Sequence, residues 1–272
     1  MLWGYFLKLV VADRLSLYVD AVFNNIGHHN GSTIALASVL FCFQLYGDFA
    51  GYSYIAIGCS RVMGFKLMDN FRRPYFFSTS IQDFWKRNHI SLTSWFMDYV
   101  YYPLIGNSKK LWWWCCAIFI TFFISGFWHG AAWTYVICFS IHGMYLVVCT
   151  LKEKKQRKFE KKYHLKKKEW WLWLNRAATF VFVATASIFF RANSTSDAFH
   201  GVSQILSNMG QLNLLDKFQR GEEDTGWGNQ SLAKVTGSWS RVPDGSGQWK
   251  ITDPTCGALN ATSGDDDPTV VQ

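Results

Sequence analysis

Two of the seven histidines lie in segments that suit acid–base chemistry. His129 lies in the segment 125–133 (SGFWHGAAW), in which small residues let a ligand or another part of the backbone approach closely. His89 lies in the segment 84–92 (FWKRNHISL), among aromatic, basic and hydroxyl side chains. Because an imidazole titrates near neutral pH, it can accept a proton in one step and return it in the next.

Each histidine also has a structural interpretation that the sequence leaves open. His129 follows a long apolar segment, so it could cap a turn by hydrogen bonding to a backbone carbonyl. His89 belongs to a basic amphipathic stretch, where an interfacial or lipid-binding role is common. A polar side chain inside a membrane is usually functional or paired, so a chemical role and a structural role for His129 stay equally open at this point.

The composition indicates a membrane protein. Half of the residues are hydrophobic and 18% are aromatic, whereas only 17% are charged, below the share of about 25% in soluble domains. A helix of about 20 apolar residues crosses the hydrocarbon layer. We therefore predict spanning or deeply inserted helices in four segments: 34–59, 111–128, 131–151 and 171–190. The first contains Gly47, Asp48 and Gly51, which predict a break in the middle of that helix.

The basic segment 152–168 predicts the orientation of these helices. It contains ten Lys or Arg residues and two Glu residues, so the positive-inside rule places it in the cytoplasm. The segment 111–128 then runs outward, and the turn at His129 lies near the outer face. A nucleic-acid-binding role does not suit a basic loop between two spanning helices. Pro74 and Pro103 enclose a stretch that we expect to form interfacial or re-entrant helices.

The charge changes sign near Leu212. Residues 1–212 hold 22 basic and 10 acidic side chains, whereas residues 213–272 hold 5 basic and 9 acidic side chains among many Gly, Ser and Thr residues. We expect a membrane domain followed by a tail that is disordered, a small module outside the membrane, or the product of an altered reading frame. The seven cysteines form no C-x-x-C pair, so no zinc site and no disulfide framework are predicted. We predict no signal peptide at the N-terminus.

Several segments, taken in order, resemble the membrane-bound O-acyltransferase (MBOAT) family. They are 46–53 (YGDFAGYS), 70–75 (NFRRPY), 84–92 (FWKRNHISL) and 127–130 (FWHG). The resemblance is greatest to the branch of bacterial alginate O-acetyltransferase membrane subunits, and it covers about residues 1–209. Family members carry further helices before and after this region, so the resemblance implies a partial membrane domain. Asn88 departs from the family pattern, which usually has an aromatic residue there.

The resemblance implies an all-α, multi-pass fold around a transmembrane tunnel. It makes His129 the main catalytic residue and His89 the second position of the active site. We also expect Asp48, Trp128, Trp85 and Asn88 to bind substrate or to support the site, with Asp48 either orienting a histidine or contacting substrate. No metal and no bound cofactor are expected.

The expected reaction is O-acetylation of an exported, alginate-like polysaccharide at the inner membrane. The donor would be acetyl-coenzyme A or another acyl thioester that enters from the cytoplasm, with His129 as the base. The expected partners are membrane lipid, the polysaccharide acceptor and an extracytoplasmic acetyltransferase that resembles SGNH hydrolases. D-alanyl transfer to teichoic acid and peptidoglycan O-acetylation stay open within the family. A transport module without chemistry and an inactive fragment are the alternatives of another class.

Overall fold

The computed structural model describes residues 1–165, 168–209, 238–242 and 248–252. The contacts divide the chain into two units, Met1–Leu212 and Asn213–Gln272. The described part of the first unit is helical, which confirms the predicted fold class. Its elements are α1 (Leu2–Tyr5), the π-helix η1 (Phe6–Ala12), α2 (Asp13–Asn24), η2 (Ile26–His28), α3 (Gly31–Val62), η3 (Tyr75–Phe77), α4 (Ile81–Arg87), α5 (Ile90–Phe96), the π-helix η4 (Met97–Tyr101), α6 (Tyr102–Ile105), α7 (Leu111–His129), α8 (Trp133–Lys162), α9 (Glu169–Arg191) and α10 (Thr195–Ser207).

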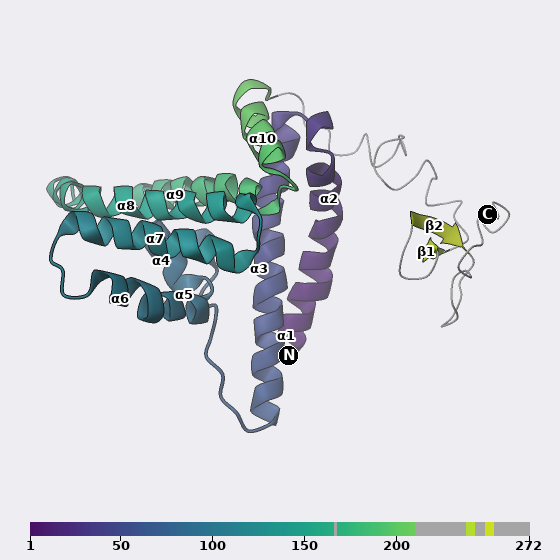
Figure 1. Cartoon of the computed structure of the whole chain (residues 1–272), viewed down its shortest axis with the longest axis horizontal. Coiled ribbons are helices and arrows are strands. Elements are labelled where there is room, and N and C mark those ends of the chain that lie inside the picture. The colour runs from purple at the N-terminus through teal and green to yellow at the C-terminus, as the bar shows by residue number, and fades with distance from the viewer. Residues whose placement is uncertain (166–167, 210–237, 243–247, 253–272) are drawn as a thin grey trace. The chain divides into compact units, whose positions relative to one another are not determined.

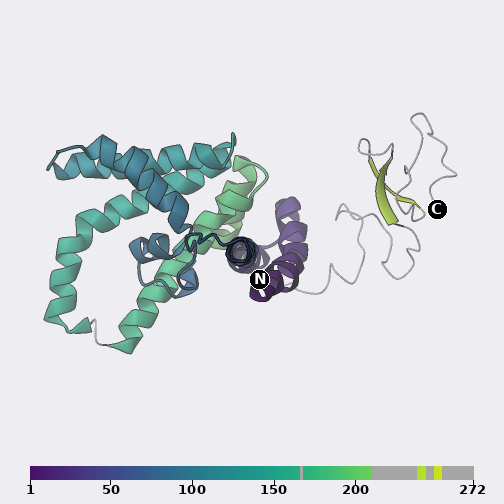
Figure 2. The same ribbon diagram turned by 90° about the horizontal axis from the view of Figure 1, so that it is seen from below.

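Four helices, α3, α7, α8 and α9, are long and apolar enough to cross a membrane. They coincide with the four segments that the sequence predicts. Helices α7 and α8 form an antiparallel hairpin with an extensive interface, and α9 packs on both α8 and α3. Figures 1 and 2 show that α3 crosses the other three steeply, so the four helices do not form one parallel bundle.

Helix α3 is continuous, so the predicted break in its middle is wrong. Gly47 and Gly51 lie one turn apart on the face that contacts α1 and η1. A Cβ atom built on Gly51 would lie 2.8 Å from the carbonyl oxygen of Gly4 and 3.0 Å from the backbone nitrogen of Lys8. These glycines therefore allow two backbones to approach each other, as small residues do between membrane helices. Asp48 is accommodated between them by an ion pair with Lys8.

The main hydrophobic core lies where α2, α3, α8, α9 and α10 meet. Its fully buried side chains include Phe23, Ile34 and Ile188. Helix α10 begins at the N-cap Ser194, whose side chain accepts a hydrogen bond from the backbone of Asp197. This core fixes the end of α9 and the start of α8 beside the middle of α3, and this is the region of the candidate site.

The basic segment after the apolar part of α8 is helical up to Lys162, whereas the sequence predicts a loop over 152–168. Lys, Arg, Gln and Glu favour helices, and side chains four residues apart interact on a helix surface. Arg157 donates a hydrogen bond to Glu153 at 2.5 Å, and Gln156 donates one to Glu160 at 3.0 Å. The charges thus extend α8 beyond its apolar part.

The described residues of the second unit form two short strands, β1 (Ser238–Val242) and β2 (Gln248–Thr252). The strands pair in antiparallel fashion, with Ser240 opposite Lys250. The prediction that the tail is disordered mainly concerns residues 210–237, 243–247 and 253–272, which lie outside the described part of the chain.

Candidate active site

His129 is the last residue of α7, in a turn that is held by aromatic contacts. Gly130 follows with a φ of 156°, and a Cβ atom there would lie 2.9 Å from the ring of Tyr135. Only glycine avoids this clash, so α7 can end directly at His129. The His129 ring stacks on Phe139 with 4.4 Å between centroids and lies 5.5 Å from the ring of Phe190. The imidazole is thus placed where α7, α8 and α9 meet.

His89 lies at the junction of two short helices. Helix α4 ends at Arg87, and α5 begins at Ile90 with His89 as its N-cap. The backbone of His89 is left-handed, with φ of 47° and ψ of 54°, a conformation that is uncommon for residues other than glycine. Its ring lies 4.5 Å from that of Phe49 on α3. The junction therefore directs the imidazole toward α3 and the end of α7.

Trp128 brings the two histidines together. Its ring lies 4.8 Å from that of His129 and 6.1 Å from that of His89, centroid to centroid. Two histidines that are 40 positions apart in the sequence therefore share one site.

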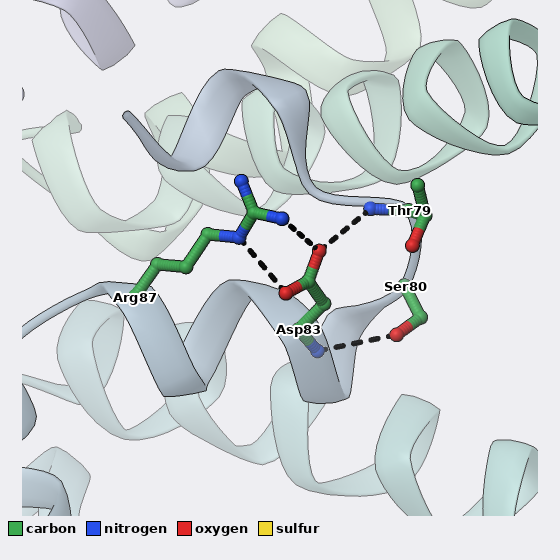
Figure 3. Close-up of polar contacts among 4 residues, drawn as sticks. All are labelled: Thr79, Ser80, Asp83 and Arg87. Carbon is green, nitrogen blue, oxygen red and sulfur yellow. Dashed lines mark hydrogen bonds and ion pairs between the residues drawn. The ribbon is translucent and has the colours of Figure 1, made fainter. Parts of the chain in front are cut away.

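Helix α4, which precedes His89, is anchored by the polar network in Figure 3. Arg87 donates two hydrogen bonds to the carboxylate of Asp83, at 2.8 and 2.7 Å. The same carboxylate accepts the backbone N–H of Thr79 at 3.1 Å, and Ser80 caps the helix by accepting the N–H of Asp83 at 3.1 Å. A two-point arginine–carboxylate pair fixes orientation as well as distance. The network thus sets the direction in which the chain enters the His89 junction.

A cavity of about 410 Å³ is separated from His129 by aromatic side chains. Its polar lining includes Gln44, Asp48 and Arg191, while Tyr135 and Phe190 form part of its apolar wall. Both of these rings also contact the His129 ring, at 6.4 and 5.5 Å between centroids. The cavity therefore borders the histidine site and offers both hydrogen-bonding groups and flat apolar surfaces to a ligand.

The profile of the membrane-bound O-acyltransferase family matches residues 4–196. This match covers both histidines, their junctions and the cavity. The chain belongs to the membrane-bound O-acyltransferase family. Within the MBOAT family, its relatives carry out more than one kind of acyl transfer.

Three relatives illustrate this range. The chain is 41% identical over 145 residues to the "Probable alginate O-acetylase AlgI" of Pseudomonas putida. The matched region is 53% of this chain and 30% of that protein. It is 36% identical over 210 residues to the peptidoglycan O-acetyltransferase of Helicobacter pylori, or 77% of this chain and 38% of that protein. It is 32% identical over 164 residues to the teichoic acid D-alanyltransferase of Bacillus subtilis, or 58% and 41%. The chain thus spans well under half the length of these relatives.

The other residues expected at this MBOAT site take different positions. Trp85 contacts Phe139, with 5.9 Å between ring centroids, so it supports the ring on which His129 stacks. Asn88 is the C-cap of α4, and its carbonyl oxygen accepts a hydrogen bond from the hydroxyl of Thr93 at 3.5 Å. Asp48 forms an ion pair with Lys8 and lines the cavity, and both roles expected for it stay predictions.

A third histidine, which the sequence motifs did not indicate, lies beside the site. His142, on α8, is 5% exposed, and its ring lies 5.3 Å from that of Trp85 and 6.4 Å from that of Phe139. Its position three residues after Phe139 on one helix was a signal that both side chains share a face. Within residues 1–165 and 168–209, no group of three His, Cys, Asp or Glu side chains is arranged to hold a metal ion.

Burial lowers the pKa of His89 from 6.5 to about 4, because the junction disfavours the charged imidazolium. Below pH 6.5 the unfolded chain binds a proton at His89 that the folded chain does not bind. The folded state should therefore lose stability as the pH falls from 6.5 toward 4.

We expect the melting temperature of the wild-type protein to fall more steeply over this pH range than that of His89→Asn. Asparagine does not titrate and tolerates the left-handed backbone. The other six histidines are present in both proteins, so the difference between the two curves isolates His89. The melting temperatures of both proteins are measured in detergent between pH 6.5 and 4.5. An equal fall of melting temperature with pH in the two proteins would contradict a buried neutral imidazole at this position.

Proposed function

We propose that this chain is the membrane-embedded part of an O-acetyltransferase that passes acetyl groups from a cytoplasmic thioester to an exported, alginate-like polysaccharide. The observation that carries the proposal is the convergence of His89 and His129 on Trp128, beside a cavity with polar and aromatic walls. Membership of the MBOAT family and the alginate O-acetylase relatives support the reaction class and the acceptor.

In the proposed reaction His129 acts as the base. Its imidazole removes the proton from the attacking hydroxyl group of the sugar, and the oxygen forms an ester with the acetyl carbon. The proton then passes to the leaving thiolate, so the imidazole is neutral again at the end of the cycle. His89 is placed to donate an N–H hydrogen bond to the oxyanion that develops on the acetyl group. The low pKa of His89 fits this role, because a neutral imidazole still carries one N–H donor.

The donor and the partners follow from the same proposal. Acetyl-coenzyme A, or another acyl thioester, is the donor from the cytoplasmic side of the inner membrane. The basic end of α8, from Lys152 to Lys162, supports this orientation, because such segments stay in the cytoplasm and attract anionic lipid. Asp48, in the cavity wall, is proposed to contact the acceptor. An extracytoplasmic acetyltransferase of the SGNH-hydrolase type is the proposed protein partner on the acceptor side.

Peptidoglycan O-acetylation is the second candidate function. The peptidoglycan O-acetyltransferase relative matches 77% of this chain, against 53% for the alginate O-acetylase, although at lower identity. Both reactions form an acetyl ester on a sugar hydroxyl group, so the same histidines would serve either acceptor. D-alanyl transfer differs in its donor, which carries an amino group.

An acetyl-transfer assay in membranes that contain the chain tests the proposal. The membranes are incubated with acetyl-coenzyme A labelled in the acetyl group, and with de-acetylated alginate or peptidoglycan glycan strands as acceptor. We expect the label to appear on alginate as an ester that mild alkali releases. Labelled peptidoglycan would support the second candidate in place of the first. Transfer from a D-alanyl thioester to teichoic acid, without acetyl transfer, would contradict both.

A further inference from the structure

Helix α5 is not capped by its own N-cap residue. The first backbone N–H groups of a helix have no partner within the helix, and a side chain at the N-cap usually accepts one of them. His89 occupies this position in α5, but its side chain forms no capping hydrogen bond. The imidazole is therefore free to face Phe49 and Trp128, and the start of the helix needs another acceptor.

Asn70 supplies that acceptor from the segment that follows α3. Its backbone oxygen accepts the N–H of Ile90 at 3.1 Å. Its side-chain Oδ1 accepts the N–H of Ser91 at 3.1 Å and the hydroxyl of Ser91 at 2.5 Å. One residue thus binds the two positions directly after His89 through three hydrogen bonds. The Asp83–Arg87 pair holds the chain on the other side of the same junction.

The His89 junction needs such support because its backbone is strained. A left-handed conformation at a residue other than glycine persists only where the surrounding structure fixes it. His89 in this conformation joins α4 to α5, and its ring lies 6.1 Å from that of Trp128. Without the hydrogen bonds of Asn70, the backbone can relax to an ordinary conformation and carry the imidazole away from the site.

We propose that Asn70 is a positioning residue, which caps α5 in place of His89 and thereby holds the His89 imidazole beside Trp128 and His129. The role of His89 in the reaction rests on the proposed function, whereas the role of Asn70 as a cap does not. This cap requires a side-chain oxygen at position 70 that accepts hydrogen bonds, as Oδ1 of Asn70 does. An aspartate can therefore replace the asparagine, and a leucine of similar size cannot.

The test compares Asn70→Leu with Asn70→Asp in the full chain in membranes. Asn107→Leu, at an exposed position before α7, is the matched control. The first readout is the rate at which diethyl pyrocarbonate modifies His89, resolved by mass spectrometry, with the exposed His200 as the internal reference. Loss of a cap typically shifts a local equilibrium roughly fivefold or more, so we expect at least this increase for Asn70→Leu. Asn70→Asp and Asn107→Leu should keep the wild-type rate.

The second readout is acetyl transfer. Asn70→Leu should lower kcat while KM stays near the wild-type value, and Asn70→Asp should restore kcat. Combined with His89→Ala, Asn70→Leu should cause no further loss, because both changes act through the same imidazole. If His89→Ala alone keeps full activity, the proposed role of His89 fails, and the modification rates still decide the role of Asn70. A wild-type modification rate in Asn70→Leu, or equal rates in the leucine and aspartate variants, would overturn the proposal.

Discussion

Replacing His129 with alanine is expected to lower acetyl transfer by about 10²–10⁴-fold, the usual contribution of a positioned acid–base group. The change removes the only group of this residue that can accept the hydroxyl proton, and it leaves the end of α7 in place because Gly130 forms the turn. The effect should appear in kcat, since the proton moves in the transition state. Transfer of labelled acetyl groups to the polysaccharide measures the loss.

The control for this experiment is His200→Ala, an exposed position on α10 that should keep wild-type activity. Membrane insertion is compared by the amount of each variant extracted in detergent. Wild-type transfer by a normally inserted His129→Ala protein would contradict the catalytic role. It would favour instead a module that conducts the donor and leaves the chemistry to a partner.

The largest structural effect is expected from Gly51→Leu. The Cβ position of Gly51 lies 2.8 Å from the oxygen of Gly4, a backbone atom that cannot move aside as a flexible side chain would. Overpacking a close contact typically costs about 1–3 kcal/mol, so the melting temperature in detergent should fall by roughly 3–10 °C. The first helical segments, α1 and η1, would separate from α3, and the Lys8–Asp48 ion pair would be lost with them.

The neighbouring substitution Tyr52→Leu is the matched control. Tyr52 is 66% exposed on the same helix, so a leucine there meets no packed backbone. Its melting temperature should stay near that of the wild-type protein. Equal melting temperatures for the two variants would show that the contact between Gly4 and Gly51 contributes little to stability.

The four long helices were predictable because each depends on a single local quantity, the length of an apolar run. The continuity of α3 was not predictable in the same way. Gly47, Asp48 and Gly51 interrupt an apolar run, and such residues often break a helix. Here they serve a contact with another segment, and Asp48 is accommodated by an ion pair with Lys8, 40 positions earlier. A break and a close contact have the same local sequence.

The candidate site was predictable in part. Motif resemblance identified His89 and His129, but local sequence contained no sign that Trp128 would lie against both rings. The cap of α5 shows the limit most clearly. Asn70 precedes Ser91 by 21 positions, and neither residue type reveals the hydrogen bond between them. The cavity wall likewise combines residues of α3, α8 and α9, which come together only in the folded chain.

The aromatic enclosure of His129 has a consequence for the fidelity of the proposed reaction. A base that activates a sugar hydroxyl group also activates water, and hydrolysis would waste the acyl donor. Phe139 covers one face of the imidazole at 4.4 Å, while the rings of Trp128 and Phe190 stand nearly perpendicular to it, at 88° and 78°. Such walls offer a water molecule few of the polar partners that it needs to stay in place. The imidazole would activate the sugar hydroxyl group and water alike. Access to the imidazole, and not the strength of the base, then decides which of the two reacts.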